Sequence, residues 1–315
     1  MTDLLRRRLL AAVAALPAIA HAAEPDKLRI GFQKSSTLTI WLKSRGTLEK
    51  ALAPLSVSVS WHEFTSGLPL LEALNVGAVD VSADVADAVP PFALAAGAKV
   101  TYYAIESPSP QAQAIVVRKD SPVTTLAQLK GQKVAFAKGA GSHYLILEAL
   151  RRAGLSIKDI EPAYLTPADG RAAFESGNVA AWVIWDPFLA AVERQAGARV
   201  LHEGDGVSAY RRFYLAATPI AQRRADLLAV VFAELQRAGE WIKKNPGPAA
   251  EWHAPVIGLD AATVETANAR RSYRVLPVDA ESLAEQQRIA DAFTAAGILP
   301  RKVVVADSPV WRPAA

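Results

Sequence analysis

Alternating hydrophobic and polar positions mark the first strands that we expect in this chain. The alternation over 28–32, and again over 55–61, has the two-residue period of a half-buried strand. Segments with helical spacing follow, one over 38–52 and a shorter one that stops at Gly77. Similar units continue to a strand at 99–105. This order of strands and helices predicts a mostly parallel sheet with helices on both faces.

A proline-rich segment at 107–110 interrupts the pattern and indicates a linker. Strand patterns return after it, at 112–117, 133–137 and 180–185, and from about residue 220 the chain becomes mainly helical. Such helices could pack back onto the first lobe. We therefore predict an α/β fold of two lobes with two linkers between them. The expected ranges are 23–109 and 215–315 for lobe 1 and 110–214 for lobe 2.

The first 22 residues have the pattern of a secretory signal peptide. Three arginines at 6–8 precede an apolar run over 9–20, and Ala-His-Ala at 20–22 is a small-x-small cleavage site. The mature chain is expected to begin near Ala23. An uncleaved anchor is the alternative, although the apolar run is shorter than the ~20 residues that span a bilayer. The arginines leave the twin-arginine route open beside the Sec route.

Composition limits the chemistry that the chain can perform. With 315 residues, of which 51% are hydrophobic, it can bury a large core. It has no cysteine, which excludes disulfides, thiolate nucleophiles and cysteine metal sites. The formal charge of +4 falls to +2 without residues 1–22, which carry three arginines and one aspartate. Short basic pairs such as Arg211 and Arg212 are expected to be solvated, so nucleic acid is not an expected partner.

The glycine-containing turn at 138–141 is a candidate anion site. It follows a buried strand and precedes a helix that Ser142 is expected to cap. Gly139 and Gly141 would let backbone N–H groups approach an anion at the helix N-terminus, where the dipole favours negative charge by ~0.3–1 kcal/mol. Ser142 and His143 could add donors, although packing would also explain the histidine. An ordinary strand-to-helix turn is the alternative, and the glycines match neither nucleotide-binding motif.

Polar residues at the ends of two other strands are further candidate ligands. Gln33, Ser35 and Ser36 offer neutral donors that can hold and release an anion, although a solvated loop is the alternative. Trp185 ends a strand and could contact the apolar part of a ligand. Asp186 could accept a hydrogen bond from that ligand, or it could cap the helix that follows, because Asp-Pro is typical of a helix start.

Asp87 lies in a loop of the first lobe, where a helix cap is the favoured role and ligand contact the alternative. The five histidines have no metal-binding spacing, and we expect neither a metal nor a cofactor. A nucleophile elbow and a paired acid and base are also missing from the sequence. These observations argue against an enzyme.

Several short segments together resemble the aliphatic sulfonate-binding periplasmic proteins of ABC importers, within the larger nitrate, sulfonate and taurine group. The matching segments are IGFQK at 30–34, LEALNVG at 71–77, SPSP at 107–110, KDSP at 119–122, KGQKVAFAKG at 130–139, HYL at 143–145, PAD at 167–169 and WDPF at 185–188. The resemblance implies a type II periplasmic binding protein-like fold, with two lobes joined by two crossover segments that close on a ligand. It also implies a periplasmic monomer that delivers a small organic anion, such as an alkanesulfonate, to an ABC permease in the inner membrane.

The resemblance implies pocket contacts from the Gln33 loop, the segment 84–89, the turn at 141–143, and Trp185 with Asp186. The chain departs from the family pattern at 86–91, where it carries ADAVPP, and at Ala140, where members often have serine. Taurine, nitrate or a pyrimidine precursor therefore stay open as ligands. An enzyme on the same fold is the rival interpretation, but a desulfinase that depends on cysteine is excluded.

Overall fold

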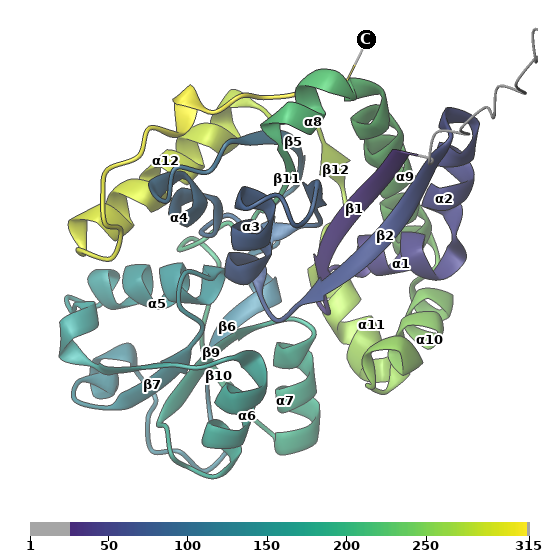
Figure 1. Cartoon of the computed structure of the whole chain (residues 1–315). Coiled ribbons are helices and arrows are strands. Elements are labelled where there is room, and N and C mark those ends of the chain that lie inside the picture. Colours follow the sequence, from purple (N-terminus) through teal and green to yellow (C-terminus); the bar gives the residue numbers. More distant parts are fainter. Residues whose placement is uncertain (1–25, 314–315) are drawn as a thin grey trace, which may run out of the picture.

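Two β-sheets, each flanked by helices, form two lobes that lie one above the other in Figure 1. The structure is a computed structural model that describes residues 26–313. The predicted signal peptide lies outside the described residues. The prediction of two α/β lobes joined by two crossovers is confirmed. The chain passes between the sheets once after residue 106 and once before residue 212.

The lobe 1 sheet has seven strands in the order β12-β5-β11-β3-β1-β2, with β4 beside β11. β1 pairs in parallel with β2 and β3, as predicted, whereas β11 runs antiparallel to β3 and β5 because it returns from the other lobe. The strands are β1 (Asp26–Gln33), β2 (Val57–Phe64), β3 (Val81–Ser82), β4 (Val85–Ala86), β5 (Val100–Glu106), β11 (Arg212–Ala217) and β12 (Val275–Leu276). The first three residues of β11 fall in the range predicted for lobe 2.

Helices cover both faces of the lobe 1 sheet. The helices of this part of the chain are α1 (Thr37–Arg45), α2 (Thr47–Leu52), α3 (Gly67–Asn75), α4 (Pro90–Ala95), α8 (Thr218–Arg223), α9 (Ala225–Lys244), α10 (Pro246–Ile257), α11 (Ala261–Arg270) and α12 (Ala280–Ala295). The single helix predicted over 38–52 is two helices, because Gly46 adopts a left-handed conformation with φ of 60° between them.

The lobe 2 sheet has five strands in the order β10-β6-β9-β7-β8. Its elements are β6 (Gln113–Val117), β7 (Lys133–Phe136), α5 (Gly141–Arg152), β8 (Glu161–Tyr164), α6 (Pro167–Glu175), β9 (Ala181–Trp185), α7 (Phe188–Ala196) and β10 (Arg199–Glu203). Short 3₁₀ helices lie at Ala53–Leu55, Pro110–Ala112, Leu126–Leu129, Ile157–Asp159 and Val305–Asp307.

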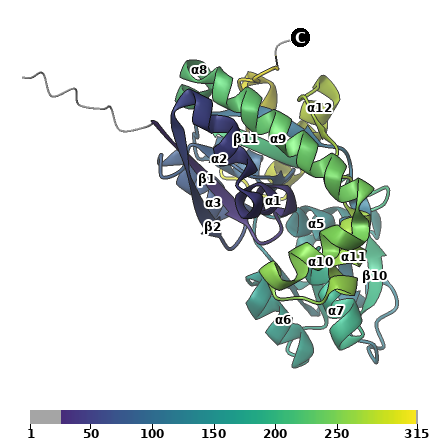
Figure 2. The same ribbon diagram turned by 90° about the vertical axis from the view of Figure 1, so that its right-hand side faces the viewer.

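The C-terminal helices contact both lobes rather than lobe 1 alone. α11 packs against α7 of lobe 2, and Figure 2 shows these helices side by side at one edge of the molecule. α12 contacts α4, and its Phe293 lies 5.2 Å from the ring of His143 in α5. These two helices therefore connect the lobes in addition to the crossovers.

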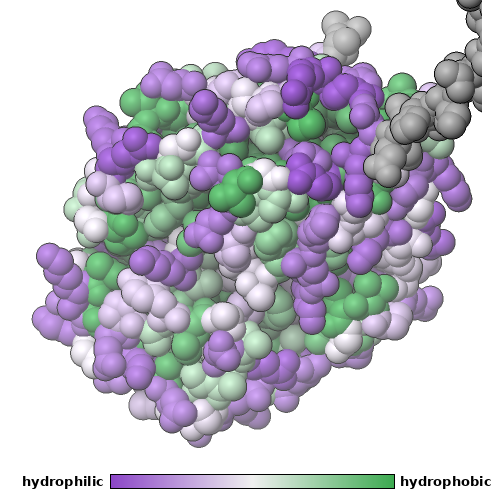
Figure 3. Space-filling view, viewed as in Figure 1, coloured by the Kyte–Doolittle hydropathy of each residue, from purple (hydrophilic) through white to green (hydrophobic). Residues whose placement is uncertain are grey.

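Buried strand residues explain why the sheets hold together. Leu28 and Ile30 of β1 pack with Leu38 of α1 and Leu228 of α9, and each such side chain contributes about 1.5–3 kcal/mol when removed from water. Hydrophilic side chains cover most of the face seen in Figure 3, with small separated apolar patches. Among residues 26–313, no helix is long and apolar enough to cross a membrane.

Candidate functional site

A cavity of about 500 Å³ lies between the two lobes. It is lined by the ends of β1 and β2 from lobe 1, by β9, α6 and α7 from lobe 2, and by the turn between α10 and α11. The predicted residues Gln33, Ser35 and Trp185 all line it. Ligands of α/β sheets bind at such strand ends, and cavities of this size hold small molecules.

Most of the cavity wall is apolar. Trp185 and Phe188 meet edge to face with ring centroids 6.1 Å apart, and Ile257 and Leu259 form part of the wall from the α10–α11 turn. A groove of about 600 Å³ near the crossovers is slightly larger, but charged residues of α5 and α12 line much of it. The cavity between the strand ends is therefore the better candidate for a ligand with an apolar part.

The loop after β1 is buried rather than solvated. Gln33 donates a hydrogen bond from Nε2 to the backbone oxygen of Asp84 at 3.0 Å, and its backbone N–H donates to Oγ of Ser36 at 3.2 Å. Ser36 is fully buried and is not part of the cavity lining. The solvated-loop alternative is therefore wrong, and Ser36 holds Gln33 in position.

The glycine turn brings α5 against lobe 1. Gly139 has φ of 70°, and α5 begins at Gly141, so that Ala140 and not Ser142 is the N-cap residue. A Cβ atom at position 141 would lie 2.5 Å from the ring of Tyr210, which allows only glycine there. Ser142 falls within the first turn of α5, fully buried, and the predicted cap is wrong because the helix starts earlier.

His143 is neutral and enclosed by aromatic rings. Its Nδ1 accepts a hydrogen bond from the backbone N–H of Gly139 at 3.1 Å, and its ring lies 5.0 Å from that of Phe136. Burial, and secondly the charge of Lys138, lower the pKa of His143 to about 4. These contacts fit the packing interpretation and also fix the glycine turn.

Trp185 and Asp186 point to different surroundings. Trp185 lines the cavity, whereas Asp186 does not. Oδ1 of Asp186 accepts a hydrogen bond from the backbone N–H of Ala190 in α7 at 3.0 Å and lies 3.5 Å from Nη1 of Arg270. Burial raises the pKa of Asp186 to about 7, although Arg270 acts in the opposite direction. Pro187 is the N-cap residue of α7, so the predicted cap position is wrong by one residue, but the Asp186 side chain does bind a backbone N–H of the first turn of α7.

Asp87 is buried, but it does not cap a helix. Val89 is the N-cap of α4, and Oδ2 of Asp87 instead accepts a hydrogen bond from the backbone N–H of Arg211 at 3.1 Å. Burial first, and the charge of Glu285 second, raise the pKa of Asp87 to about 7. The predicted cap is wrong because the chain forms the short strand β4 at this point and pairs with β11.

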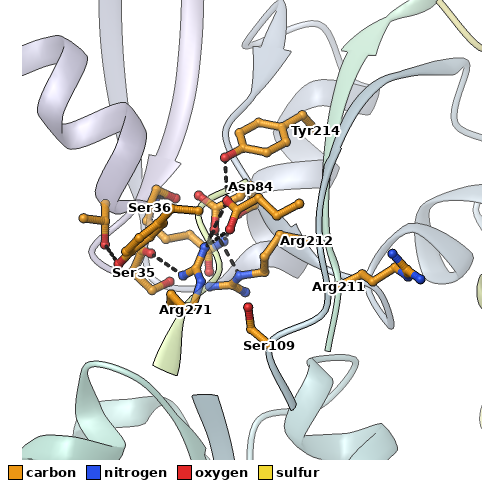
Figure 4. Close-up of polar contacts among 12 residues, drawn as sticks. Ser35, Ser36, Asp84, Ser109, Arg211, Arg212, Tyr214 and Arg271 are labelled. Carbon is orange, nitrogen blue, oxygen red and sulfur yellow. Dashed lines mark hydrogen bonds and ion pairs between the residues drawn. The ribbon is translucent and has the colours of Figure 1, made fainter. Parts of the chain in front are cut away.

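A buried charged cluster contacts the loop that follows β1 (residues 34–36, here called the cavity loop), and the sequence did not predict this cluster (Figure 4). It contains Asp84, Glu106, Arg212 and Arg271. Oδ2 of Asp84 lies 3.0 Å from Nε of Arg212 and 3.3 Å from Nη2 of Arg271. Arg271 also donates to Glu106 at 2.8 Å. The prediction that Arg211 and Arg212 are solvated is wrong, since these residues are 8% and 2% exposed.

Two features of the sequence could have indicated this cluster. Glu106 ends the strand β5, in which every residue is buried, and a buried carboxylate requires a cationic or hydrogen-bonding partner. Arg212 starts another strand, which is buried up to Ala216. An isolated charge in a buried strand is therefore a signal, although the sequence does not reveal its partner.

Several buried donors near the lobe contact have no hydrogen-bond partner among residues 26–313. They include Nη2 of Arg212, Oγ of Ser142 and Nε1 of Trp185. An unsatisfied buried donor costs about 1–3 kcal/mol, so native structures rarely keep one without a purpose. Of the three residues named, Trp185 alone lines the cavity, and donors from β11, α5 and β9 near an apolar wall fit a ligand with an anionic head and an apolar tail. In the described part of the chain, no group of three or more potential ligands could hold a metal ion.

This two-lobed architecture, with an interlobe cavity at the strand ends, defines the class of periplasmic binding protein folds. Two solved structures of such proteins have a similar fold. The alkanesulfonate-binding protein SsuA from Xanthomonas axonopodis pv. citri bound to MOPS is similar with a TM-score of 0.87 and 39% identity, covering 92% of this chain and 100% of that chain. The periplasmic aliphatic sulphonate binding protein SsuA from Escherichia coli gives a TM-score of 0.84 and 42% identity, covering 92% and 93%.

The chain belongs to the NMT1-like family, whose model matches residues 21–255. An aliphatic sulfonates-binding protein of Escherichia coli (strain K12) is 43% identical over 297 residues, which cover 94% of this chain and 92% of the relative. The resemblance seen in the sequence is confirmed at the level of the family.

Proposed function

We propose that this chain is the solute-binding component of an ABC importer and that it binds aliphatic sulfonates. The observation that carries the proposal is the apolar interlobe cavity, lined by Trp185, together with unsatisfied buried donors at the lobe contact, one of them in the first turn of α5. A sulfonate presents three acceptor oxygens and one negative charge, and its alkyl chain prefers an apolar wall. The helix N-terminus and neutral donors suit such a head group.

The biological setting follows from the same proposal. The signal-peptide pattern and the periplasmic relatives support a mature protein in the periplasm. The two lobes would close on the ligand and present the closed form to a permease in the inner membrane. We propose a monomer that binds its ligand without chemical conversion and requires no cofactor.

Taurine is the second candidate ligand, because one carboxylate lines the cavity. Glu63 at the end of β2 could accept a hydrogen bond from the ammonium group of taurine. Asp186, which the sequence suggested for this role, is instead directed to Arg270 and α7. Nitrate has no tail and would leave the apolar wall without contacts.

Calorimetric titration of the mature protein, refolded to remove bound ligand, tests the proposal. The panel is ethanesulfonate, longer alkanesulfonates, taurine, nitrate and an aminopyrimidine. We expect a micromolar response, about −8 kcal/mol, for sulfonates. Silence for every sulfonate, with a response to another compound, would overturn the proposed ligand class.

Variants of two lining or adjacent residues locate the site. Trp185→Ala removes an aromatic wall and is expected to weaken binding by about 30-fold, as aromatic hot-spot truncations do. Trp185→Phe keeps most of the wall but removes the Nε1 donor, and Ser142→Ala removes a buried hydroxyl. Ser58→Ala on the exposed part of β2 is the control. Unchanged affinity in Trp185→Ala and Ser142→Ala would refute this location.

A further inference from the structure

A buried arginine of the charged cluster retains unused hydrogen-bonding capacity. The side chain of Arg212 is 3% exposed, and in Figure 4 it points into the cluster while that of Arg211 points away. Nε of Arg212 lies 3.0 Å from Oδ2 of Asp84 as an ion pair, but neither Nε nor Nη2 has a hydrogen-bond partner in the part of the chain that the structure describes. Arg271, by contrast, donates to both oxygens of Glu106 and to the backbone of Ser35. Arg212 therefore uses fewer of its N–H donors than Arg271 does.

Tyr210 connects this arginine to the N-terminus of α5. The guanidinium carbon of Arg212 lies 5.0 Å from the centroid of the Tyr210 ring. The same ring contacts Gly141, the first residue of α5, so closely that no side chain fits there. Ser142 follows, and its buried Oγ lacks a partner among the described residues. The arginine and the helix N-terminus therefore flank one ring at the contact between the lobes.

The cavity loop touches the same cluster from the other direction. Gln33 donates to the backbone oxygen of Asp84 at 3.0 Å, and the backbone oxygen of Ser35 accepts from Nη1 of Arg271 at 3.3 Å. Gln33 and Ser35 both line the cavity. The cluster itself does not line the cavity, but two lining residues contact it directly, so the head of a ligand bound beside Gln33 and Ser35 would lie next to the residues that hold the cluster.

We propose that Arg212 is the cation that binds the sulfonate head group, and that Asp84 holds Arg212 in place and limits the affinity. This inference rests on the proposed function. A planar guanidinium with free N–H groups matches an oxyanion better than neutral donors alone, and charge-assisted hydrogen bonds are the stronger kind. The Asp84 carboxylate repels the same anion, so the bound state stays weak enough for release to a permease.

The two partners of the Arg212–Asp84 pair give opposite predictions. Arg212→Gln is expected to weaken ethanesulfonate binding by about 10- to 100-fold, the range of a lost charged hydrogen bond. Asp84→Asn frees Arg212 and removes a repulsive charge, so it is expected to tighten binding several-fold. If the pair were only structural, both substitutions would weaken binding. Arg211→Gln is the matched control, because Arg211 contacts Glu281 and Glu285 of α12 instead.

The experiment is calorimetric titration of the wild type and these variants with ethanesulfonate, with circular dichroism melts to verify folding. Arg212→Lys, which keeps the charge, replaces Arg212→Gln if the latter does not fold, and intermediate affinity is then expected. Wild-type affinity in the Arg212 variant, or weaker binding in Asp84→Asn, would overturn the inference while leaving the proposed function intact. A wild-type protein that binds no sulfonate would overturn the proposed function itself.

Discussion

The chain has two pairs of adjacent arginines, Arg211 with Arg212 and Arg270 with Arg271, and the two members of each pair have different surroundings. Arg211 and Arg270 reach carboxylates at contacts between parts of the molecule, on α12 and on lobe 2 respectively. Arg212 and Arg271 turn inward to the buried cluster with Asp84 and Glu106. The outer side chains are 10% and 22% exposed, and the inner ones only 3% each.

This difference separates two kinds of charge. In the inner cluster, two guanidiniums balance two carboxylates away from water, where an uncompensated charge is costly. The pairs of Arg211 with Glu281 and of Arg270 with Glu193 retain access to water, which screens them and can hydrate a carboxylate that is left alone. We therefore expect the inner cluster to control folding and ligand affinity, and the outer pairs to adjust how the lobes and C-terminal helices meet.

The largest effect is expected for Arg271→Ala. It leaves Glu106 without its cation, and breaking a buried pair in this way costs about 3–5 kcal/mol. Urea unfolding monitored by circular dichroism measures the loss. Arg270→Ala is the matched control at the adjacent position. Equal losses in the two variants would contradict the distinction between inner and outer arginines.

We expect the free energy of unfolding to depend on pH through Asp87, which has both an outer and an inner arginine, Arg211 and Arg212, as neighbours. Its pKa is raised to about 7 in the folded protein, by burial and then by Glu285, against about 3.9 when unfolded. The unfolded chain therefore releases this proton first, and stability falls as the pH rises from about 4 to about 7.

Asp87→Asn should remove this part of the pH dependence. Unfolding of the wild type and the variant at several pH values measures the difference, with Asp120→Asn, which alters an exposed carboxylate, as the control. Parallel curves for wild type and Asp87→Asn across this range would show that Asp87 is ionised in the folded protein.

The smallest effect on stability is expected for Arg270→Gln. Arg270 donates to Glu193 at 2.7 Å, but this carboxylate is 21% exposed, and pairs of this kind contribute about 0–1 kcal/mol. Its other partner, the buried Asp186, lies 3.5 Å away and can bind a proton when the cation is removed, because burial already raises its pKa to about 7. The exchanged pair Arg270→Glu with Glu193→Arg should restore any loss. Thermal unfolding is a sufficient measurement, and a loss as large as that of Arg271→Ala would place Arg270 among the inner arginines.

The sequence predicted those features that depend on neighbours along the chain. The strand at 28–32, the glycine turn and Trp185 at a strand end all follow from local patterns; Gln33 after that strand and Trp185 line the cavity, whereas the glycine turn does not. Residues whose partners are distant were missed or misassigned. Glu106 and Arg271 are 165 positions apart, and Asp87 meets a backbone N–H 124 positions away. No local pattern encodes such pairs, so only the fold reveals them.

A crystal structure of the complex with 2-bromoethanesulfonate tests the central claim most directly. The anomalous signal of bromine would locate the tail, and the sulfonate density would locate the head. We predict bromine in the cavity against Trp185 and Phe188, with the sulfonate at the first turn of α5 near Arg212. Bromine in the groove between α5 and α12, or a sulfonate directed away from α5, would contradict the site proposed for this protein.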